Sequence, residues 1–155
     1  MTARPQIPMR LLCPTDFSES ADRAQRRAVG LARALGAELV LLHVATDPPP
    51  LYNEGFWGLA DVPAFVEGQR KWATDMLQSR VETIVKDGIA ARAKVAAGVP
   101  VNEIVRAAAE EGVAFIIMGT HGRGQLDRLL LGSVADRVIR LAPCPVMTVR
   151  EGIEN

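Results

Sequence analysis

The stretch VAFIIMGTHGRGQLDRLLLGSVADRVIRL, residues 113–141, decides the fold. Its first seven residues, VAFIIMG, are all apolar or glycine, which is typical of a strand buried on both faces of a sheet. A glycine-bearing loop follows, and we expect a helix from about residue 132 to residue 141. A buried strand that leads through a loop into a helix is the repeating unit of a parallel α/β sheet.

The same unit recurs along the rest of the chain. In residues 18–36 apolar side chains repeat at helical spacing, with Asp16 or Ser18 as a candidate cap at the start and Gly36 as the end. The other expected elements are strands at 9–14, 38–45, 91–97 and 145–150, and helices at about 62–87 and from residue 100 onward. Strands that alternate with helices imply right-handed crossovers and a mainly parallel sheet with helices on both faces.

Chain length predicts one domain spanning residues 1–155. A chain of 155 residues can form one stable hydrophobic core, whereas two domains of half that length would each have a marginal core. One stretch interrupts the alternation of elements. Residues 46–63 (TDPPPLYNEGFWGLADVP) contain four prolines and two glycines, together with three aromatic residues. We interpret this stretch as a long irregular insertion; a lid over a ligand and aromatics folded over the sheet edge are equal alternatives.

The charge balance excludes several classes of partner. The 18 Lys and Arg residues equal the 18 Asp and Glu residues, so no global basic field favours nucleic acid or an anionic membrane. No apolar run approaches the roughly 20 residues that cross a bilayer. The only cysteines, Cys13 and Cys144, are far apart and indicate no disulfide framework, so we expect a cytoplasmic protein.

The expected topology points to one edge of the sheet as the ligand site. In open parallel sheets, ligands bind outside the carboxyl ends of the strands. The residues at or just past three expected strand ends are Thr15 and Asp16, His43 and Val44, and residues 118–124.

The loop between the strand and the helix of the opening stretch has the composition of a phosphate cradle. Gly119, Gly122 and Gly124 allow close approach of backbone N–H groups to phosphate oxygens, and Gly132-Ser133 adds the free amides of a helix start. The loop lacks the lysine of a Walker motif and the third glycine of the dinucleotide motif. On glycine chemistry alone, phosphate binding and a merely tight connection remain equal alternatives.

The order of motifs resembles one known family. Glycine, two residues, glycine, nine residues and Gly-Ser, from Gly119 to Ser133, resembles the nucleotide-binding signature of the universal stress protein family. The segments FIIMGTHGRG, LLLGSVADRVIRLAPCPVMTVR, LLCPTDFSESA and LLHV resemble the family as well. The resemblance covers almost the whole chain outside residues 46–63.

Membership of the ATP-binding subgroup implies a fold and a set of contacts. The implied fold is a Rossmann-like single α/β domain whose open, twisted, parallel sheet has five strands in the order 3-2-1-4-5. The resemblance implies that Asp16 contacts the adenosine part and that the glycine loop and helix start hold ribose and phosphates. The implied nucleotide-binding residues are Pro14, Thr15, Asp16, Val44, Met118, Gly119, His121, Gly122, Arg123, Gly124, Gly132, Ser133 and Val134.

The chain departs from the family pattern in the middle of the loop. Gly124-Gln125 stands where similar proteins often have Thr-Gly, which removes a hydroxyl and moves a glycine by one place. The resemblance therefore implies no particular conformation for residues 123–126.

Partners follow from the same reasoning. The resemblance implies a homodimer that pairs through the C-terminal strand at residues 145–150. Mg²⁺ is expected on the phosphates rather than on protein side chains, because the cysteines and histidines are too scattered to form a metal site. A protein partner of unknown identity is also compatible with the sequence.

Several residues have a plain structural alternative to a functional role. Asp16 is the nucleotide contact or a helix cap, or both. His121 lacks a sequence-placed carboxylate that would make it a general base, so a backbone-anchoring or phosphate-contact role is favoured. His43 is interpreted as a satisfied core histidine. Arg123 and Arg128 either neutralise phosphate charge or are solvated surface residues, with Arg123 the better candidate.

Three functions remain as hypotheses. The leading one is an ATP-binding protein of stress response or signalling that hydrolyses ATP slowly at most, because no clear catalytic base or lysine for phosphoryl transfer is present. The alternative is a dimeric partner-binding module with a vestigial nucleotide site. The third is an ATPase or nucleotidyl transferase, which the missing paired-histidine motif near the first strand disfavours.

Overall fold

The computed structural model describes residues 8–46, 62–121 and 131–150. Within these ranges a five-stranded sheet has the order β3-β2-β1-β4-β5, and every neighbouring pair is parallel. The strands are β1 Arg10–Pro14, β2 Glu38–Ala45, β3 Ala91–Ala97, β4 Phe115–Gly119 and β5 Val146–Val149. The predicted strand order and parallel direction are confirmed.

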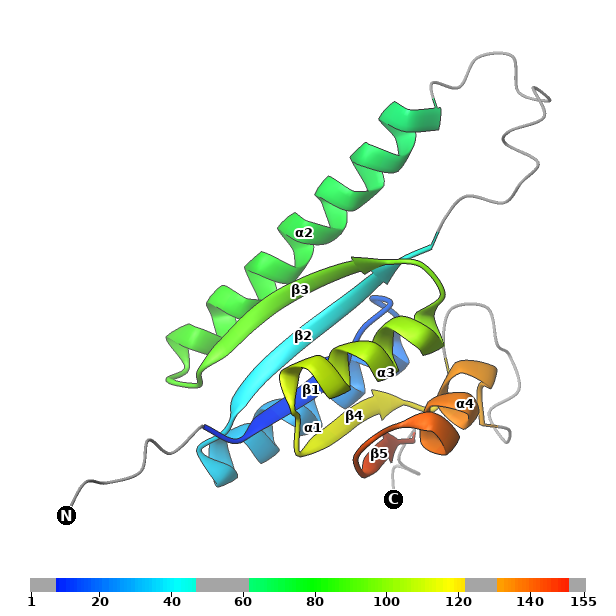
Figure 1. Cartoon of the computed structure of the whole chain (residues 1–155). Coiled ribbons are helices and arrows are strands. Elements are labelled where there is room, and N and C mark those ends of the chain that lie inside the picture. The colour runs from blue at the N-terminus through cyan, green and yellow to red at the C-terminus, as the bar shows by residue number, and fades with distance from the viewer. Residues whose placement is uncertain (1–7, 47–61, 122–130, 151–155) are drawn as a thin grey trace.

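Helices cover both faces of the sheet (Figure 1). Helices α1 (Glu19–Leu35) and α2 (Val62–Lys86) pack on one face, and α3 (Pro100–Glu111) and α4 (Ser133–Leu141) pack on the other. Along β2, Leu39 and Leu41 face α1 and α2, whereas Val40 and Leu42 face α3 and α4. All four side chains are fully buried, so both faces of this strand need apolar residues and the apolar run is uninterrupted.

Local signals fix the boundaries of α1. Ser18 is the N-cap residue, and its side-chain oxygen accepts a hydrogen bond from the Ala21 N–H at 3.2 Å. Gly36 ends the helix in the left-handed conformation with φ of 61°, which costs glycine no steric strain. Of the two predicted caps, Ser18 is therefore correct and Asp16 is not the N-cap.

Three strands are shorter than the sequence predicts, and the first of them, expected at 9–14, begins at Arg10. The strand expected at 113–119 begins at Phe115, because the Val113 N–H donates to the Ala108 carbonyl and closes the end of α3. The strand expected at 145–150 spans Val146–Val149. Pro145 has no N–H to donate, although its carbonyl accepts a hydrogen bond from the Ile116 N–H.

Only the second half of α2 belongs to the core. Its buried residues begin at Ala73 and continue through Leu77, Val81 and Ile84. Earlier in the helix, Phe65 is 50% exposed and Trp72 is 44% exposed. Figure 1 shows the reason, since the first half of α2 extends past the carboxyl ends of β2 and β3.

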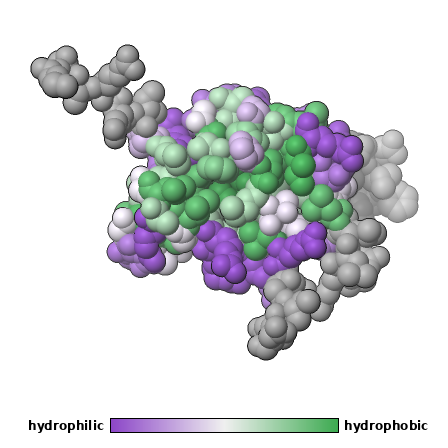
Figure 2. Space-filling view, turned by 90° about the horizontal axis from the view of Figure 1, so that it is seen from below, coloured by the Kyte–Doolittle hydropathy of each residue, from purple (hydrophilic) through white to green (hydrophobic). Residues whose placement is uncertain are grey.

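The lower side of the molecule in Figure 1 is formed by α1, α4 and β5. Figure 2 views this side and shows hydrophobic residues gathered in its middle, with hydrophilic residues around them. The exposed large apolar side chains of α4 and β5 are Ile139, Leu141 and Met147. In the part of the chain that the structure describes, no helix is both long and apolar enough to cross a bilayer.

Candidate functional site

A cavity of about 680 Å³ opens at the carboxyl edge of the sheet. This volume is in the range of small-molecule sites, roughly 300–1,000 Å³. Its lining comes from the ends of β1, β2 and β4 and from the starts of α3 and α4, with the first half of α2 as a further wall. The topological rule that pointed to this edge therefore leads to a real cavity.

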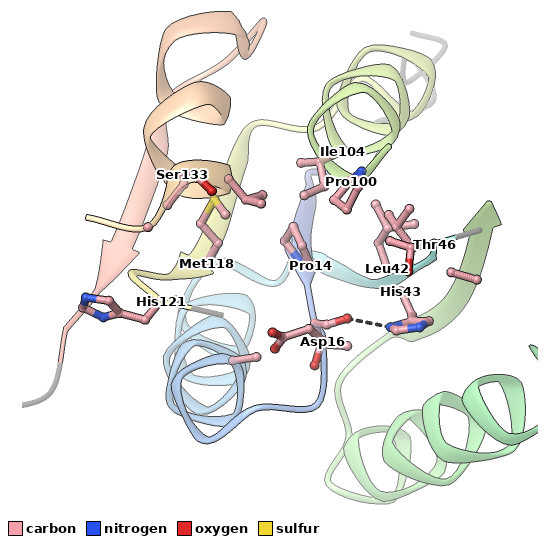
Figure 3. Close-up of a pocket in the computed structure, with 18 of the residues that line it drawn as sticks. Pro14, Asp16, Leu42, His43, Thr46, Pro100, Ile104, Met118, His121 and Ser133 are labelled. Carbon is pink, nitrogen blue, oxygen red and sulfur yellow. Dashed lines mark hydrogen bonds between the residues drawn. The ribbon is translucent and has the colours of Figure 1, made fainter. Parts of the chain in front are cut away.

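Ten of the thirteen sequence-predicted site residues line this one cavity. They are Pro14, Thr15, Asp16, Val44, Met118, Gly119, His121, Gly132, Ser133 and Val134. The other three, Gly122, Arg123 and Gly124, lie outside the described residues. Figure 3 shows Pro14, Asp16, Met118 and Ser133 gathered around the cavity from three separate segments of the chain.

Asp16 sits on a tight turn between β1 and α1. Its Oδ1 accepts a hydrogen bond from the Ser18 N–H at 3.0 Å, and the Thr15 hydroxyl accepts one from the Phe17 N–H at 3.0 Å. Phe17 has φ of 62°, an unusual conformation for a non-glycine residue. The carboxylate thus stabilises the turn just before the helix and still lines the cavity.

Gly119 is required by a close approach of β4 to the first turn of α1. A Cβ at this position would lie 2.4 Å from the Ser20 Oγ and 2.9 Å from the carbonyl carbon and oxygen of Ser20. The hydroxyl can rotate away, but the backbone cannot. Any side chain here would therefore push apart the two elements that carry Asp16 and the glycine loop.

Among the residues that the structure describes, no side chain caps the N-terminus of α4, which borders the cavity. Gly132 is the N-cap residue and provides no capping side chain, while Ser133 and Val134 form the first turn and line the cavity. The Gly132 N–H donates to the Thr120 carbonyl at 2.7 Å, which ties the helix start to the end of β4. A helix start with uncapped N–H groups attracts anions.

The backbone of Val44 faces the cavity because β2 extends beyond the end of β1. The register pairs Pro14, the last residue of β1, with Leu42, and β2 continues to Ala45. Even-numbered residues of β2 bond toward β1, as in the hydrogen bond from the Thr15 N–H to the Leu42 carbonyl. The N–H and C=O of Val44 therefore point into the space beyond the end of β1.

His121 lines the rim of the cavity rather than its centre. Its Nδ1 lies 2.8 Å from the Thr120 hydroxyl, and its N–H donates to the Ser20 Oγ at 3.4 Å. The Nε2 atom is buried and has no hydrogen-bond partner among the residues that the structure describes. Figure 3 shows the ring turned away from Ser133 and Met118. The backbone N–H of His121 therefore ties the residues after β4 to the first turn of α1.

The core around the end of β1 is apolar. Cys13 precedes Pro14 and is fully buried, and burial raises the pKa of its thiol to about 12. No group of three His, Cys, Asp or Glu side chains suited to a metal ion occurs within residues 8–46, 62–121 and 131–150.

The expectation for His43 is wrong in one respect. The sequence suggested a core histidine, but the side chain is only partly buried and lines the cavity. It is satisfied, since its Nδ1 lies 2.9 Å from the Thr15 carbonyl oxygen. The topological rule already placed His43 at the ligand edge of the sheet, and only its interpretation as a core residue is wrong.

The wall from α2 was missed by sequence reasoning. Phe65, Val66, Gln69, Arg70 and Trp72 line the cavity on this side. No sequence pattern indicated this, because the position of α2 along the sheet depends on tertiary packing.

Comparison with known proteins points to one family. The sequence model of the universal stress protein family matches residues 9–150. Universal stress protein MJ0531 of Methanocaldococcus jannaschii is 35% identical over 144 residues, which cover 92% of this chain and 82% of that protein.

Solved structures agree with the sequence match. Protein MJ0577 of the same organism has a TM-score of 0.72 at 32% identity, over 93% of this chain and 96% of that one. A universal stress protein from Archaeoglobus fulgidus, in complex with dAMP, has a TM-score of 0.64 at 23% identity, over 92% and 98% of the two chains. At that identity the second likeness shows a shared fold.

Proposed function

Because the chain belongs to the universal stress protein family, we propose that it binds ATP at the carboxyl edge of its sheet. The observation that carries this proposal is the convergence of three features on one cavity: the Asp16 carboxylate, the exposed backbone of Val44, and the uncapped start of α4. Each feature matches a different part of an adenine nucleotide.

The base is proposed to lie against the end of β2. Adenine presents an amino donor beside a ring acceptor, and the Val44 C=O and N–H offer the complementary pair. Pro14, Ile104 and Met118 line the same region with apolar groups that can pack on the faces of the ring. The Asp16 carboxylate lines the cavity and is proposed to accept hydrogen bonds from the ribose hydroxyls.

The phosphates are proposed to lie between the end of β4 and the start of α4. Gly119 lets the backbone approach closely, and the N–H groups of Ser133 and Val134 add donors at the positive end of a helix dipole. Gly122, Arg123 and Gly124 are assigned to the same subsite on the family pattern alone. Mg²⁺ is proposed to arrive with the phosphates as their counter-ion.

Two further points support an adenine nucleotide. The cavity volume of about 680 Å³ is sufficient for a ligand of this size. The Archaeoglobus protein of the same fold is in complex with dAMP.

We propose binding, with slow hydrolysis at most, as the activity. The His121 ring has a threonine hydroxyl rather than a carboxylate as its recorded side-chain partner, so nothing in the described residues orients it as a general base. Binding without rapid turnover suits a sensor or carrier of adenine nucleotide in stress response or signalling. The cytoplasmic location remains a prediction from cysteine usage.

Calorimetry with ATP and Mg²⁺ tests the proposal directly. We expect saturable binding of ATP and much weaker binding of GTP, because guanine has a carbonyl at the position where the adenine amino group would donate to the Val44 carbonyl. Asp16→Ala should weaken binding, whereas Asp87→Ala, the same change in the exposed turn after α2, should not. Mass spectrometry of the purified protein would identify any retained nucleotide.

The outcomes separate the three functions. Absence of binding at millimolar ATP would overturn the proposal and favour a partner-binding module. Multiple-turnover phosphate release that depends on Asp16 or His121 would favour an enzyme.

We also propose a homodimer that pairs through the C-terminal strand. β5 is an edge strand, and Met147 on it is 43% exposed, beside the exposed Ile139 and Leu141 of α4. An open edge with apolar side chains favours pairing with a second copy. Met147→Glu should convert a dimer to a monomer in analytical ultracentrifugation, whereas Val85→Glu, at an exposed position of α2, should not.

A further inference from the structure

Three rings stack on the α2 side of the Asp16 turn. The Phe17 ring centroid lies 4.8 Å from that of His43 and 5.0 Å from that of Trp72, with the Trp72 contact edge-on. The Arg80 guanidinium lies over the Phe17 ring at 5.2 Å and also donates to Asp22 of α1. This stack joins β2, the turn and α2 at the edge of the cavity.

Within the stack, His43 makes one polar contact with the turn. Its Nδ1 lies 2.9 Å from the Thr15 carbonyl oxygen, visible as the dashed line in Figure 3. A carbonyl oxygen only accepts hydrogen bonds, so Nδ1 carries the proton and donates. The contact therefore fixes both the ring orientation and the protonated nitrogen.

This contact completes the anchoring of Thr15 to β2. The Thr15 N–H donates to the Leu42 carbonyl at 2.8 Å, and the Thr15 carbonyl accepts from His43. Both backbone groups of the residue before Asp16 are thus bound to one strand. The peptide that leads into Asp16 has a defined plane as a result.

The residue after Asp16 needs the same support. Phe17 has a positive φ of 62°, which costs a non-glycine residue about 1–2 kcal/mol. Such a conformation persists only where surrounding contacts hold it. Here the His43 and Trp72 rings hold the Phe17 side chain.

We propose that His43 is a positioning residue of the nucleotide site, which holds the Thr15 carbonyl and the Phe17 ring so that Asp16 is presented to the ligand. This inference rests on the proposed nucleotide binding and adds a residue to it. His43 acts through Asp16 and the turn, since its identified polar contact is with the Thr15 backbone.

The same hydrogen bond also bears on Val44. If the parallel ladder between β1 and β2 continued by one step, the Thr15 carbonyl would be the acceptor for the Val44 N–H. In the structure this carbonyl accepts a hydrogen bond from the His43 side chain instead. The Val44 N–H lies beyond the last paired residue of β1, where it can donate to a ligand.

The variants His43→Asn and His43→Gln test whether the position of the side-chain donor matters, or only its polarity. In His43→Asn the side-chain amide nitrogen occupies nearly the place of Nδ1, whereas in His43→Gln it lies farther out. We expect His43→Gln and His43→Leu to weaken ATP binding about tenfold, the loss of roughly one hydrogen bond. His43→Asn should lose about threefold or less. Equal affinities of all three variants and the native protein would overturn the proposal.

A double-mutant cycle tests whether His43 acts through Asp16. In an Asp16→Ala background, His43→Leu should cause little further loss of ATP affinity, because the group that it positions is gone. Fully additive losses would indicate that His43 contacts the nucleotide by itself and would contradict a positioning role.

A second readout does not need a nucleotide. Amide hydrogen exchange in the free protein reports the Phe17 and Ser18 N–H groups, which bond to Thr15 Oγ1 and Asp16 Oδ1. Their protection should fall in His43→Gln and persist in His43→Asn, while protection in β2 and β4 stays constant in both. Unchanged protection of the turn in His43→Gln would overturn the proposal. If native protein fails to bind ATP, the proposed function fails, and the exchange result still decides the positioning role.

Discussion

The two edges of the sheet differ in chemistry although the same strands form both. At the carboxyl edge, polar groups such as Asp16 and Ser133 line a cavity. At the amino edge, charged side chains pair with one another: Glu38 accepts from Arg10 at 2.9 Å and from Arg92 at 3.0 Å, and Glu111 pairs with Arg92 and Lys94. One edge is open to a ligand, and the other is closed by its own ion pairs.

Chain direction explains this difference. In a parallel sheet with helical crossovers, every helix starts at the carboxyl edge and ends at the amino edge. Helix starts carry free N–H groups and positive dipole ends, which suit an anionic ligand. Helix ends carry free carbonyls. Here Gly36 and Gly112, in the left-handed conformation, donate their backbone N–H groups to carbonyls of the last turns of α1 and α3. Binding is therefore expected at one edge and stabilisation at the other.

The largest effect is expected from Gly119→Ala at the carboxyl edge. The added Cβ would lie 2.9 Å from backbone atoms of Ser20, so the protein should lose about 2–3 kcal/mol of unfolding free energy. Nucleotide binding should be lost as well, because β4 and α1 must separate. Urea denaturation and calorimetry measure the two losses.

Gly30→Ala is the matched control for that change. A Cβ at Gly30, inside α1, meets nothing within 4 Å, and alanine should stabilise the helix by about 0.5–1 kcal/mol. If Gly119→Ala were as stable as the native protein and still bound ATP, the close approach of β4 to α1 would not constrain the site.

A smaller effect, confined to stability, is expected from Glu111→Gln at the amino edge. The Glu111 side chain is 15% exposed, and its pKa is lowered chiefly by the hydrogen bond from Arg92. The change should cost about 1–2 kcal/mol of unfolding free energy at pH 7 and leave ATP affinity unchanged. Changed affinity would show that the two edges are coupled.

The pH dependence of this loss has a defined sign. Because the Glu111 pKa is lower in the folded protein, its carboxylate stabilises the fold at pH values above the pKa of the unfolded chain, about 4.3. This stabilisation is lost as the pH falls through the pKa of the folded protein. The difference between native protein and Glu111→Gln should therefore shrink between pH 5 and pH 3. Glu82→Gln, at an exposed position of α2, should stay within about 0.5 kcal/mol of native protein at pH 7.

The smallest effect concerns the two thiols, one near each edge. Cys13 is fully buried with a pKa of about 12, so at pH 8 it stays protonated and unreactive in the folded protein. Cys144 precedes β5 and is partly buried, and burial raises its pKa as well. A chromogenic disulfide reagent should modify only Cys144 before unfolding. Rapid labelling of folded Cys144→Ser protein would mean that the core around Cys13 opens.

Much of the fold could be predicted because its signals are local. Strands Glu38–Ala45 and Ala91–Ala97 have the predicted bounds, and Ser18 and Gly36 end α1 as capping chemistry requires. Where prediction failed by a residue or two, as at Val113, a tertiary or capping hydrogen bond ended the element.

The candidate site divides in the same way. The sequence by itself determined the parallel sheet and the edge at which the cavity lies, because hydrophobic periodicity, turn chemistry and chain direction are encoded in neighbouring residues. Three features were decided only by the tertiary structure. His43 lies outside the core and binds the Thr15 carbonyl, β2 extends past the end of β1 at Val44, and α2 lines one side of the cavity. These features depend on the strand register and on the position of α2 along the sheet, and both are set by packing between segments distant in sequence.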